Sequence, residues 1–422
     1  MQSKVTIKNL TNNEYIFSVI AKFIGIFTGI IYTILFSRYF GAELRGQSSV
    51  ILNYGEMISL VLCLGVYQAY PYFKKEFKKD IYIEYINYIF GLLVLYIIIA
   101  CILILNIDFD ITTKISIILA PILMGIKQLN YVVLIENSKL RNTSNIKLDI
   151  FDIVLLAVLM VFTKANLVLC ILFLIVKHLV FLFIAISNLQ IKISDIRPTL
   201  KGIMPYIKYG IVPMLTVILM EINYKVDIIM LDRFYVSTTD IGIYSLGVML
   251  AQKIWIITDA LKDILLSKLA KGRTVDEVSK VTRISLFITI LIIIGVICFG
   301  KPFIVLLYGK EYSGSYLVTL IIMAGVVGMV FYKMVYSYNV VNGHKNINLI
   351  LLGIAALLNI IVNIVAIPHL GSLGAALASL VSYSICGIAF LMYFCIKTQT
   401  PIRNMLLINK NDIKMIKLFF YK

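Results

Sequence analysis

The sequence predicts an all-α integral membrane protein with twelve transmembrane helices, arranged as two pseudo-symmetric six-helix lobes around a central cavity. Hydrophobic residues make up 60% of the 422 residues and charged residues only 14%, which is too apolar for a soluble chain of this length. The apolar residues come in runs of 18 or more, long enough for a helix to cross a bilayer. A sequence pattern also recurs in the two halves of the chain, which favours two related lobes.

Twelve apolar segments are the predicted membrane-spanning helices. They cover residues 14–36, 47–71, 83–105, 113–135, 147–163, 166–187, 208–232, 240–262, 282–300, 316–341, 347–367 and 372–396. The fifth segment is short, and only a tight turn at 164–166 joins it to the sixth. If this segment did not cross the membrane, the orientation of every later helix would be inverted.

The distribution of Lys and Arg indicates the orientation. With the N-terminus in the cytoplasm, 26 of the 39 basic residues fall in cytoplasmic segments and 7 in outer loops, the bias that the positive-inside rule describes. Both termini are therefore predicted to be cytoplasmic. The net charge of +17 follows from this topology and does not indicate a nucleic-acid partner.

Neither a metal nor another cofactor is expected. The six cysteines all fall within the predicted spans, without a CxxC motif or a Cys/His cluster, so we interpret them as packing residues. The polar N-terminal stretch and the first apolar run show no signal-peptide cleavage pattern.

The repeated pattern predicts the domain organisation. Arg38 matches Arg233, an aromatic residue follows each, and Gly46 matches Gly242 after one inserted residue. Because each half holds six segments, both lobes would have the same orientation in the membrane. We expect an N-terminal lobe over 1–195, a C-terminal lobe over 196–396 and a basic cytoplasmic tail over 397–422. The tail fits an amphipathic helix on the inner leaflet and, equally, a disordered basic segment.

Six basic residues fall inside the predicted spans. A charge near the membrane centre costs about 2.5–3.5 kcal/mol, so six uncompensated cations would cost on the order of 15–20 kcal/mol. They must be paired, hydrated or both, and we expect them to form a cationic substrate-binding cavity. They are Lys22, Lys127, Lys177, Lys225, Lys253 and Lys333.

The first predicted helix has a polar and small face. Ser18, Lys22, Gly25, Gly29 and Tyr32 recur at helical spacing. This face is suited to lining a cavity. It is also suited to close helix packing through small residues, with Lys22 paired to Glu56 on the second helix.

The ion-coupling candidates are Glu56, Glu221 and Asp227, because a carboxylate within a membrane can bind a proton or Na⁺. For Glu221, a structural ion pair with Lys225 four residues away competes with this role. His178 is interpreted as a packing residue rather than a proton-coupling one. No catalytic residues are predicted.

Several motifs resemble those of the multidrug/oligosaccharidyl-lipid/polysaccharide exporter superfamily. Residues 227–231 (DIIML) with 240–244 (DIGIY) are similar to its pattern in helices 7 and 8, and 307–312 (LYGKEY) to the outer loop before helix 10. Residues 341–345 (VNGHK), 359–363 (NIIVN) and 367–376 (IPHLGSLGAA) resemble its signature in helices 10 to 12. Twelve helices with lysines in the spans are most similar to the polysaccharide repeat-unit (O-antigen and capsule, Wzx-like) flippases.

This resemblance implies a function, a location and partners. It implies a transporter in the bacterial inner membrane that flips undecaprenyl-pyrophosphate-linked oligosaccharides to the outer leaflet by alternating access, for O-antigen, lipopolysaccharide or capsule synthesis. The implied partners are this lipid-linked cargo, membrane lipids, H⁺ or Na⁺, and a polysaccharide polymerase.

Two other functions fit the sequence less well than the flippase does. A drug/cation antiporter of the same superfamily is disfavoured because six lysines would repel cationic drugs. A polysaccharide polymerase or acyltransferase is disfavoured because the chain has neither a large outer loop nor an Asp close to a His.

Overall fold

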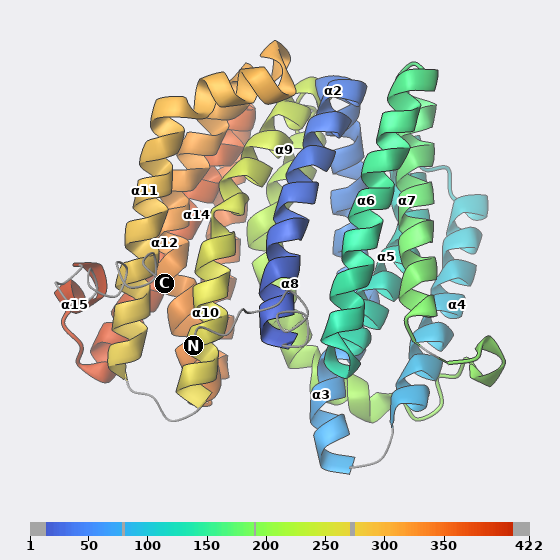
Figure 1. Ribbon diagram of the computed structural model, residues 1–422, viewed down its shortest axis with the longest axis horizontal. Helices are drawn as coiled ribbons and strands as arrows, with labels where there is room; N and C mark the ends of the chain where they lie inside the picture. Colours follow the sequence, from blue (N-terminus) through green and yellow to red (C-terminus); the bar gives the residue numbers. More distant parts are fainter. Residues whose placement is uncertain (1–13, 78–80, 190, 271–274, 408–422) are drawn as a thin grey trace, which may run out of the picture. The chain divides into compact units, whose positions relative to one another are not determined.

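The chain folds almost entirely into long helices (Figure 1). The computed structural model describes residues 14–77, 81–189, 191–270 and 275–407, and the side chains of a few helical residues, Lys22 among them, lie outside this description. All twelve predicted segments are helical apart from short breaks, so the predicted all-α fold class is confirmed. Most of the basic tail and the extreme ends lie outside the described residues, and their cytoplasmic placement stays a prediction.

The chain divides within α8 (Met204–Arg233) into two compact units, Met1–Ile218 and Leu219–Lys422. The lobes over 1–195 and 196–396 and the tail over 397–422 stay predictions of domain organisation.

The first unit is built around α5, which packs against α2, α3, α4, α6 and α7. Its helices are α2 (Glu14–Leu62), α3 (Val66–Phe77), α4 (Tyr82–Asn106), α5 (Ile111–Glu136), α6 (Ser138–Phe162) and α7 (Leu167–Ser187). Gly41, with φ 73° and ψ 177°, breaks α2 into its two predicted spans. The loop expected between these spans is therefore helical except at this turn, where a positive φ suits glycine.

Helix α6 is longer than its predicted span. It begins at Ser138, nine residues before the predicted start at 147, and has 25 residues, which at 1.5 Å each is about 37 Å and enough to cross a bilayer. The Asn137 side chain caps its first turn by accepting a hydrogen bond from the Leu140 amide at 2.9 Å. The first half of this helix is polar, so the length of the apolar run does not predict where the helix begins.

The second unit is built around α12, which packs against α9, α10, α11 and α14. Besides the end of α8, its helices are α9 (Thr238–Lys253), α10 (Trp255–Ala270), α11 (Val275–Tyr308), α12 (Ser315–Val341), α13 (Lys345–Leu370), α14 (Ser372–Thr398) and the short α15 (Ile402–Leu406). A Cβ at Gly387 would lie 2.0 Å from the Gly328 carbonyl oxygen, so α12 and α14 touch backbone to backbone. Close contact through small residues is typical of helices packed in a membrane.

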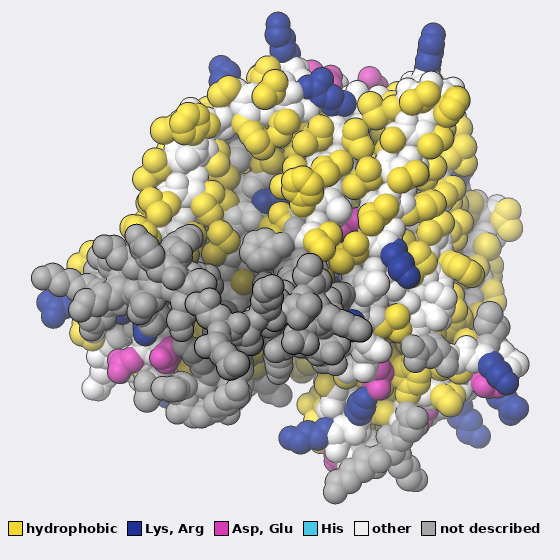
Figure 2. Space-filling model, in the orientation of Figure 1, with side chains coloured by type: hydrophobic (Ala, Val, Ile, Leu, Met, Phe, Trp, Pro, Cys, Tyr) yellow, Lys and Arg dark blue, Asp and Glu magenta, His cyan; other side chains and the backbone are white. Residues whose placement is uncertain are grey.

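Hydrophobic side chains cover the outer faces of the helices. Figure 2 shows them over α11 in the second unit and over α6 and α7 in the first, and Ile294 and Phe183 are 51% and 69% exposed. Among the described residues, nine stretches are long and apolar enough to cross a membrane. One of these, Ile24–Glu76, holds the second part of the first predicted span and all of the second span, on either side of Gly41. Helices α6 and α8 are not among the nine, and both carry charged residues within their spans.

Candidate functional site

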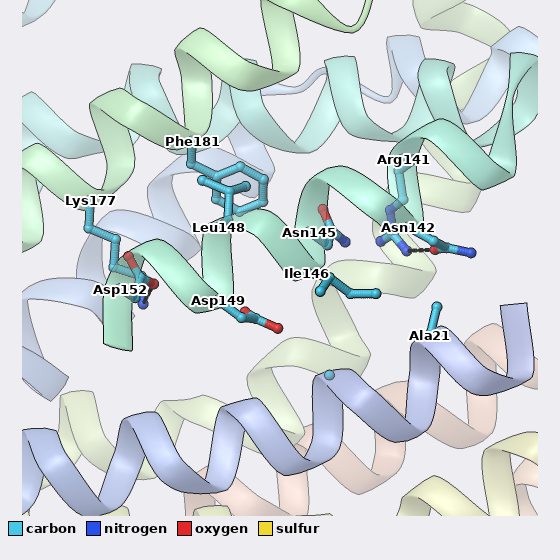
Figure 3. Close-up of a pocket in the computed structure, with 11 residues that line it drawn as sticks. Ala21, Arg141, Asn142, Asn145, Ile146, Leu148, Asp149, Asp152, Lys177 and Phe181 are labelled. Atoms are coloured by element: carbon cyan, nitrogen blue, oxygen red, sulfur yellow. Dashed lines mark hydrogen bonds and ion pairs between the residues drawn. The ribbon is translucent and has the colours of Figure 1, made fainter. Parts of the chain in front are cut away.

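The first unit holds a cavity of about 330 Å³ between α2, α6 and α7 (Figure 3). Its lining combines charged, amide and apolar side chains: Ala21, Gly25, Arg141, Asn142, Asn145, Ile146, Leu148, Asp149, Asp152, Lys177 and Phe181. Most of the polar groups come from α6. Asn142, Asn145, Asp149 and Asp152 follow one another at intervals of three and four residues, which places them on one helical face.

One ion pair lies at the end of this cavity. The Lys177 Nζ is 2.9 Å from Asp152 Oδ2 and lies 3.9 Å from the centre of the Tyr32 ring. Asp152 is only 5% exposed. Two charges removed from water need each other to offset their desolvation, so this lysine is neutralised by a carboxylate in the conformation described.

A second carboxylate joins α6 to α2. Asp149 Oδ2 accepts a hydrogen bond from the Thr28 hydroxyl at 2.8 Å, and a Cβ on Gly25 would lie 3.8 Å from the same oxygen. Gly25 lines the cavity and Tyr32 contacts Lys177. Both belong to the polar and small face predicted for the first helix, so this face borders a cavity in the first unit.

The second unit buries the carboxylate of Asp227, which is 2% exposed. It accepts three hydrogen bonds, from the Tyr244 hydroxyl at 2.7 Å, the Asn363 amide at 2.7 Å and the Ser379 hydroxyl at 2.5 Å. These donors come from α9, α13 and α14, while Asp227 lies on α8. Within the described part of the chain, no Lys or Arg lies within ion-pair distance of this carboxylate.

Two more of the six lysines hold carboxylates in the second unit. Lys225 Nζ is 2.9 Å from Glu221 Oε2, so the ion pair expected from their spacing is confirmed. Lys333 Nζ is 2.7 Å from Asp259 Oδ1 and 4.5 Å from the centre of the Trp255 ring. With Lys177, three of the six predicted binding lysines are thus paired.

The remaining candidates are scattered. Lys127 lies half-buried on α5 and makes no ion pair among the described residues, and Lys253 is half-buried at the end of α9. Glu56 is half-buried on α2, and the Lys22 side chain lies outside the described residues, which leaves their pairing untested. His178 is 8% exposed and its Nδ1 is 2.7 Å from the Leu174 carbonyl, which agrees with its interpretation as a packing residue. The binding and coupling roles of all these residues stay predictions.

Sequence reasoning missed four charged residues of these sites. Asp149 and Asp152 lie in the fifth predicted span, where the sequence does not show which lysine they face, and Arg141 contributes to the predicted topology only. Asp259 was overlooked in the same way. The signal that could have found the first three is the regular polar spacing along the start of α6.

Comparisons with known structures define the class of fold. The chain has a TM-score of 0.74 to a lipid II flippase MurJ in an inward closed conformation, at 18% identity, covering 96% of this chain and 92% of that one. It has a TM-score of 0.69 to an inward-facing multidrug resistance MATE family transporter of the MOP superfamily, at 12% identity over 89% and 94% of the two chains. A MOP superfamily transporter from Pyrococcus furiosus matches with a TM-score of 0.58, at 13% identity over 94% and 99%. The fold is therefore that of the transporter superfamily which the motifs resemble.

The family follows from the sequence. Residues 56–317 match the family described as polysaccharide biosynthesis protein, which is more than half of the chain, and the chain belongs to this family. No curated protein matches the chain.

Proposed function

We propose that this protein flips undecaprenyl-pyrophosphate-linked oligosaccharides from the cytoplasmic to the outer leaflet of the bacterial inner membrane, for the synthesis of a surface polysaccharide such as O-antigen or capsule. The observation that carries the proposal is the pairing of a polysaccharide biosynthesis sequence with a fold shared with a lipid II flippase. The charged cavity of the first unit supports it, because an apolar cargo would not need buried ions.

The cargo has a headgroup that cannot cross hydrocarbon alone. An ionised group moved from water into an apolar medium without a partner loses hydration worth tens of kcal/mol. Lysines inside the spans would supply the compensating charge. Lys177, Lys225 and Lys333 already hold carboxylates, so binding a pyrophosphate there requires each amine to exchange one anion for another.

That exchange gives a physical reason for ion coupling. A carboxylate released from its lysine must be neutralised by a proton or a cation, because a lone buried charge is costly. Asp227 is a buried carboxylate without a lysine partner among the described residues, since its hydrogen-bond donors are all uncharged. We propose that H⁺ or Na⁺ binds at Asp227, and that its uptake and release drive the alternation between inward-open and outward-open states.

The test is a flipping assay with the full-length protein in proteoliposomes. The probe is a fluorescent undecaprenyl-pyrophosphate-linked oligosaccharide, and its exposure on each side is read by quenching with dithionite. We expect Lys177→Met and Lys333→Met to reduce the flipping rate at least tenfold. Lys114→Met is the matched control, because Lys114 pairs with the fully exposed Asp108 in the loop before α5.

Two outcomes would contradict the proposal. Unchanged flipping in both lysine variants would exclude Lys177 and Lys333 as the groups that compensate the charge of the headgroup. Failure of the wild type to flip the probe, together with export of a lipophilic cation dye, would favour the drug/cation antiporter instead.

A further inference from the structure

The segment that joins α7 to α8 is held against the start of α4 (Figure 1). The Arg197 amide donates to Asn87 Oδ1 at 2.8 Å, and the Thr199 amide donates to the Asn87 carbonyl at 3.2 Å. A Cβ on Gly91 would lie 2.5 Å from the Thr199 carbonyl oxygen, so the two backbones touch. Residues 192–203, which we call the strap, are therefore tied to one helix, and a partner of their side chains does not have to order the backbone first.

The strap carries three cations and one carboxylate. Lys192, Arg197 and Lys201 are exposed, and none of them makes an ion pair with a carboxylate among the described residues. The carboxylate is that of Asp195, which accepts a hydrogen bond from the neighbouring Ser194 hydroxyl at 3.2 Å. The positive-inside rule accounts for basic residues on this side of the membrane, but it does not require them to be held in place without an acidic partner.

Tyrosines surround the start of α4 beside the strap. Glu84, the acidic residue in the first turn of α4, accepts hydrogen bonds from the Tyr88 hydroxyl at 2.7 Å and the Tyr206 hydroxyl at 3.0 Å. The rings of Tyr72 and Tyr209 stack with their centres 4.1 Å apart, and these residues are 41% and 43% exposed. Because tyrosine is enriched at the interface between a membrane and water, this end of α4 fits the level of the lipid headgroups.

The length of α4 indicates the same level. Its 25 residues, Tyr82–Asn106, extend about 37 Å, which is more than the hydrocarbon core of about 30 Å, so its first turns reach the headgroups. Two apolar side chains beside the strap cations are exposed there, since Leu200 is 37% exposed and Met204 is 56% exposed. Exposed apolar side chains next to cations are typical of a segment that lies at the boundary between headgroups and acyl chains.

We propose that the strap binds anionic phospholipid headgroups of the leaflet that it faces, which in the predicted topology is the cytoplasmic one. Lys192, Arg197 and Lys201 neutralise the phosphates of these lipids, while Leu200 and Met204 enter the region below the headgroups. A soluble phosphate would pair with the cations but leave both apolar side chains in water, whereas a lipid accommodates both. The site anchors the first unit to the membrane surface, and it does not depend on the flippase function.

The test measures which lipid contacts the strap. Ser194 is replaced by Cys and labelled with an uncharged fluorophore, after the exposed Cys101 and Cys298 have been replaced by Ser. The full-length protein is reconstituted in phosphatidylcholine vesicles with either brominated phosphatidylglycerol or brominated phosphatidylcholine as the quencher. We expect a preference for phosphatidylglycerol of at least about fivefold, since one Lys or Arg near an anionic membrane surface contributes a factor of about five.

Two triple variants assign this preference to the strap. Lys192→Gln/Arg197→Gln/Lys201→Gln removes the three charges, and it is expected to reduce the preference to about twofold or less. Lys192→Arg/Arg197→Lys/Lys201→Arg keeps the charges and is expected to preserve the preference. Thermal unfolding of each variant shows that the fold is kept, because all three side chains are exposed.

The matched control removes the same charge elsewhere. Lys164→Gln/Lys301→Gln/Lys310→Gln replaces three exposed lysines of the predicted outer loops and is expected to keep the preference. An equal loss in this control would assign the preference to the net charge of the protein and overturn the inference. Equal quenching by both lipids in the wild type, or a preference that survives in the Gln variant of the strap, would overturn it as well. Displacement of phosphatidylglycerol by excess inorganic phosphate at constant ionic strength would assign the cations to a soluble anion instead.

Discussion

Replacing Asp152 with Ala is expected to destabilise the protein by about 3 kcal/mol. Removing one partner of a buried ion pair costs about 3–5 kcal/mol, because the other charge remains buried without compensation. The lower value applies here for two reasons. The Lys177 side chain keeps 22% exposure, and it retains its contact with the Tyr32 ring, a cation–π interaction of roughly 0.5–2 kcal/mol.

The double variant decides whether the pair causes this loss. Asp152→Ala combined with Lys177→Met leaves no charge at the site, and replacing a buried ion pair by apolar groups is often neutral. We therefore expect the double variant to lie within about 1 kcal/mol of wild type, with a coupling energy of roughly 2–3 kcal/mol.

Thermal unfolding in detergent measures these differences through buried thiols. Cys63 and Cys170 are at most 1% exposed, so a thiol-reactive fluorescent dye reports their exposure on unfolding. Cys101 and Cys298 are exposed and are first replaced by Ser in every variant. About 3 kcal/mol corresponds to a fall in Tm of roughly 6–12 °C for a unit of this size.

The reasoning is refuted if the double variant is as unstable as the two single losses added together. That result would mean that Asp152 and Lys177 stabilise the fold through separate contacts. Lys114→Ala serves as the control, since its partner Asp108 is fully exposed and no measurable change in Tm is expected.

Three further predictions concern other parts of the chain. Asp227→Asn keeps the side-chain shape but removes the charge, and it is expected to abolish the dependence of flipping on a H⁺ or Na⁺ gradient in proteoliposomes while the protein remains folded. Gly387→Ala places a methyl group 2.0 Å from the Gly328 carbonyl oxygen and is expected to lower Tm by several degrees, from about 1–3 kcal/mol of overpacking; Gly295→Ala, with nothing within 4 Å, is expected to leave Tm unchanged or raised. His178→Gln is expected to leave the pH profile of flipping unchanged, because the buried ring is held by a backbone carbonyl, and a shifted profile would assign it a role in proton coupling.

The sequence was sufficient for the parts of the fold that the membrane imposes. A span must be a long apolar helix because its backbone groups have no water to bind, and each predicted segment is helical for this reason. The ends of the helices depend on local groups instead. Gly41 turns the chain within one residue where a loop was expected, and the Asn137 cap starts α6 well before its apolar part.

The candidate site could be predicted from the sequence only in part. Lysines inside apolar spans are evident in the sequence, and all six stand out because a charge within the membrane costs free energy. Their partners depend on how helices rotate against each other: Asp152 reaches Lys177 from α6, and Asp259 reaches Lys333 across α10 and α12. Only Glu221 and Lys225 could be paired in advance, because they share one helical face.

The helix pairs α6–α7 and α13–α14 hold contacts at matching positions. Asp152 is the fifteenth residue of α6 and Lys177 the eleventh of α7, and their ion pair has a counterpart at the same positions of α13 and α14. There the fifteenth residue, Asn359, donates to the hydroxyl of the eleventh, Ser382, at 3.2 Å. The contact is thus charged in α6–α7 and neutral in α13–α14.

In the second unit the buried carboxylate is Asp227, which lies on another helix, α8. Asn363, one turn beyond Asn359 on α13, donates to Asp227 of α8 and to the side-chain oxygen of Asn359. Asn359 and Ser382 are therefore linked to this carboxylate through Asn363. A paired charge beside a cavity can be exchanged for an anion or bridged by hydroxyl groups, whereas a buried carboxylate with only neutral donors has room for a small cation or a proton. Asp152 pairs with a lysine beside a cavity, whereas Asp227 has only neutral donors. This difference is the asymmetry that the proposed coupling of a glycolipid to an ion would require.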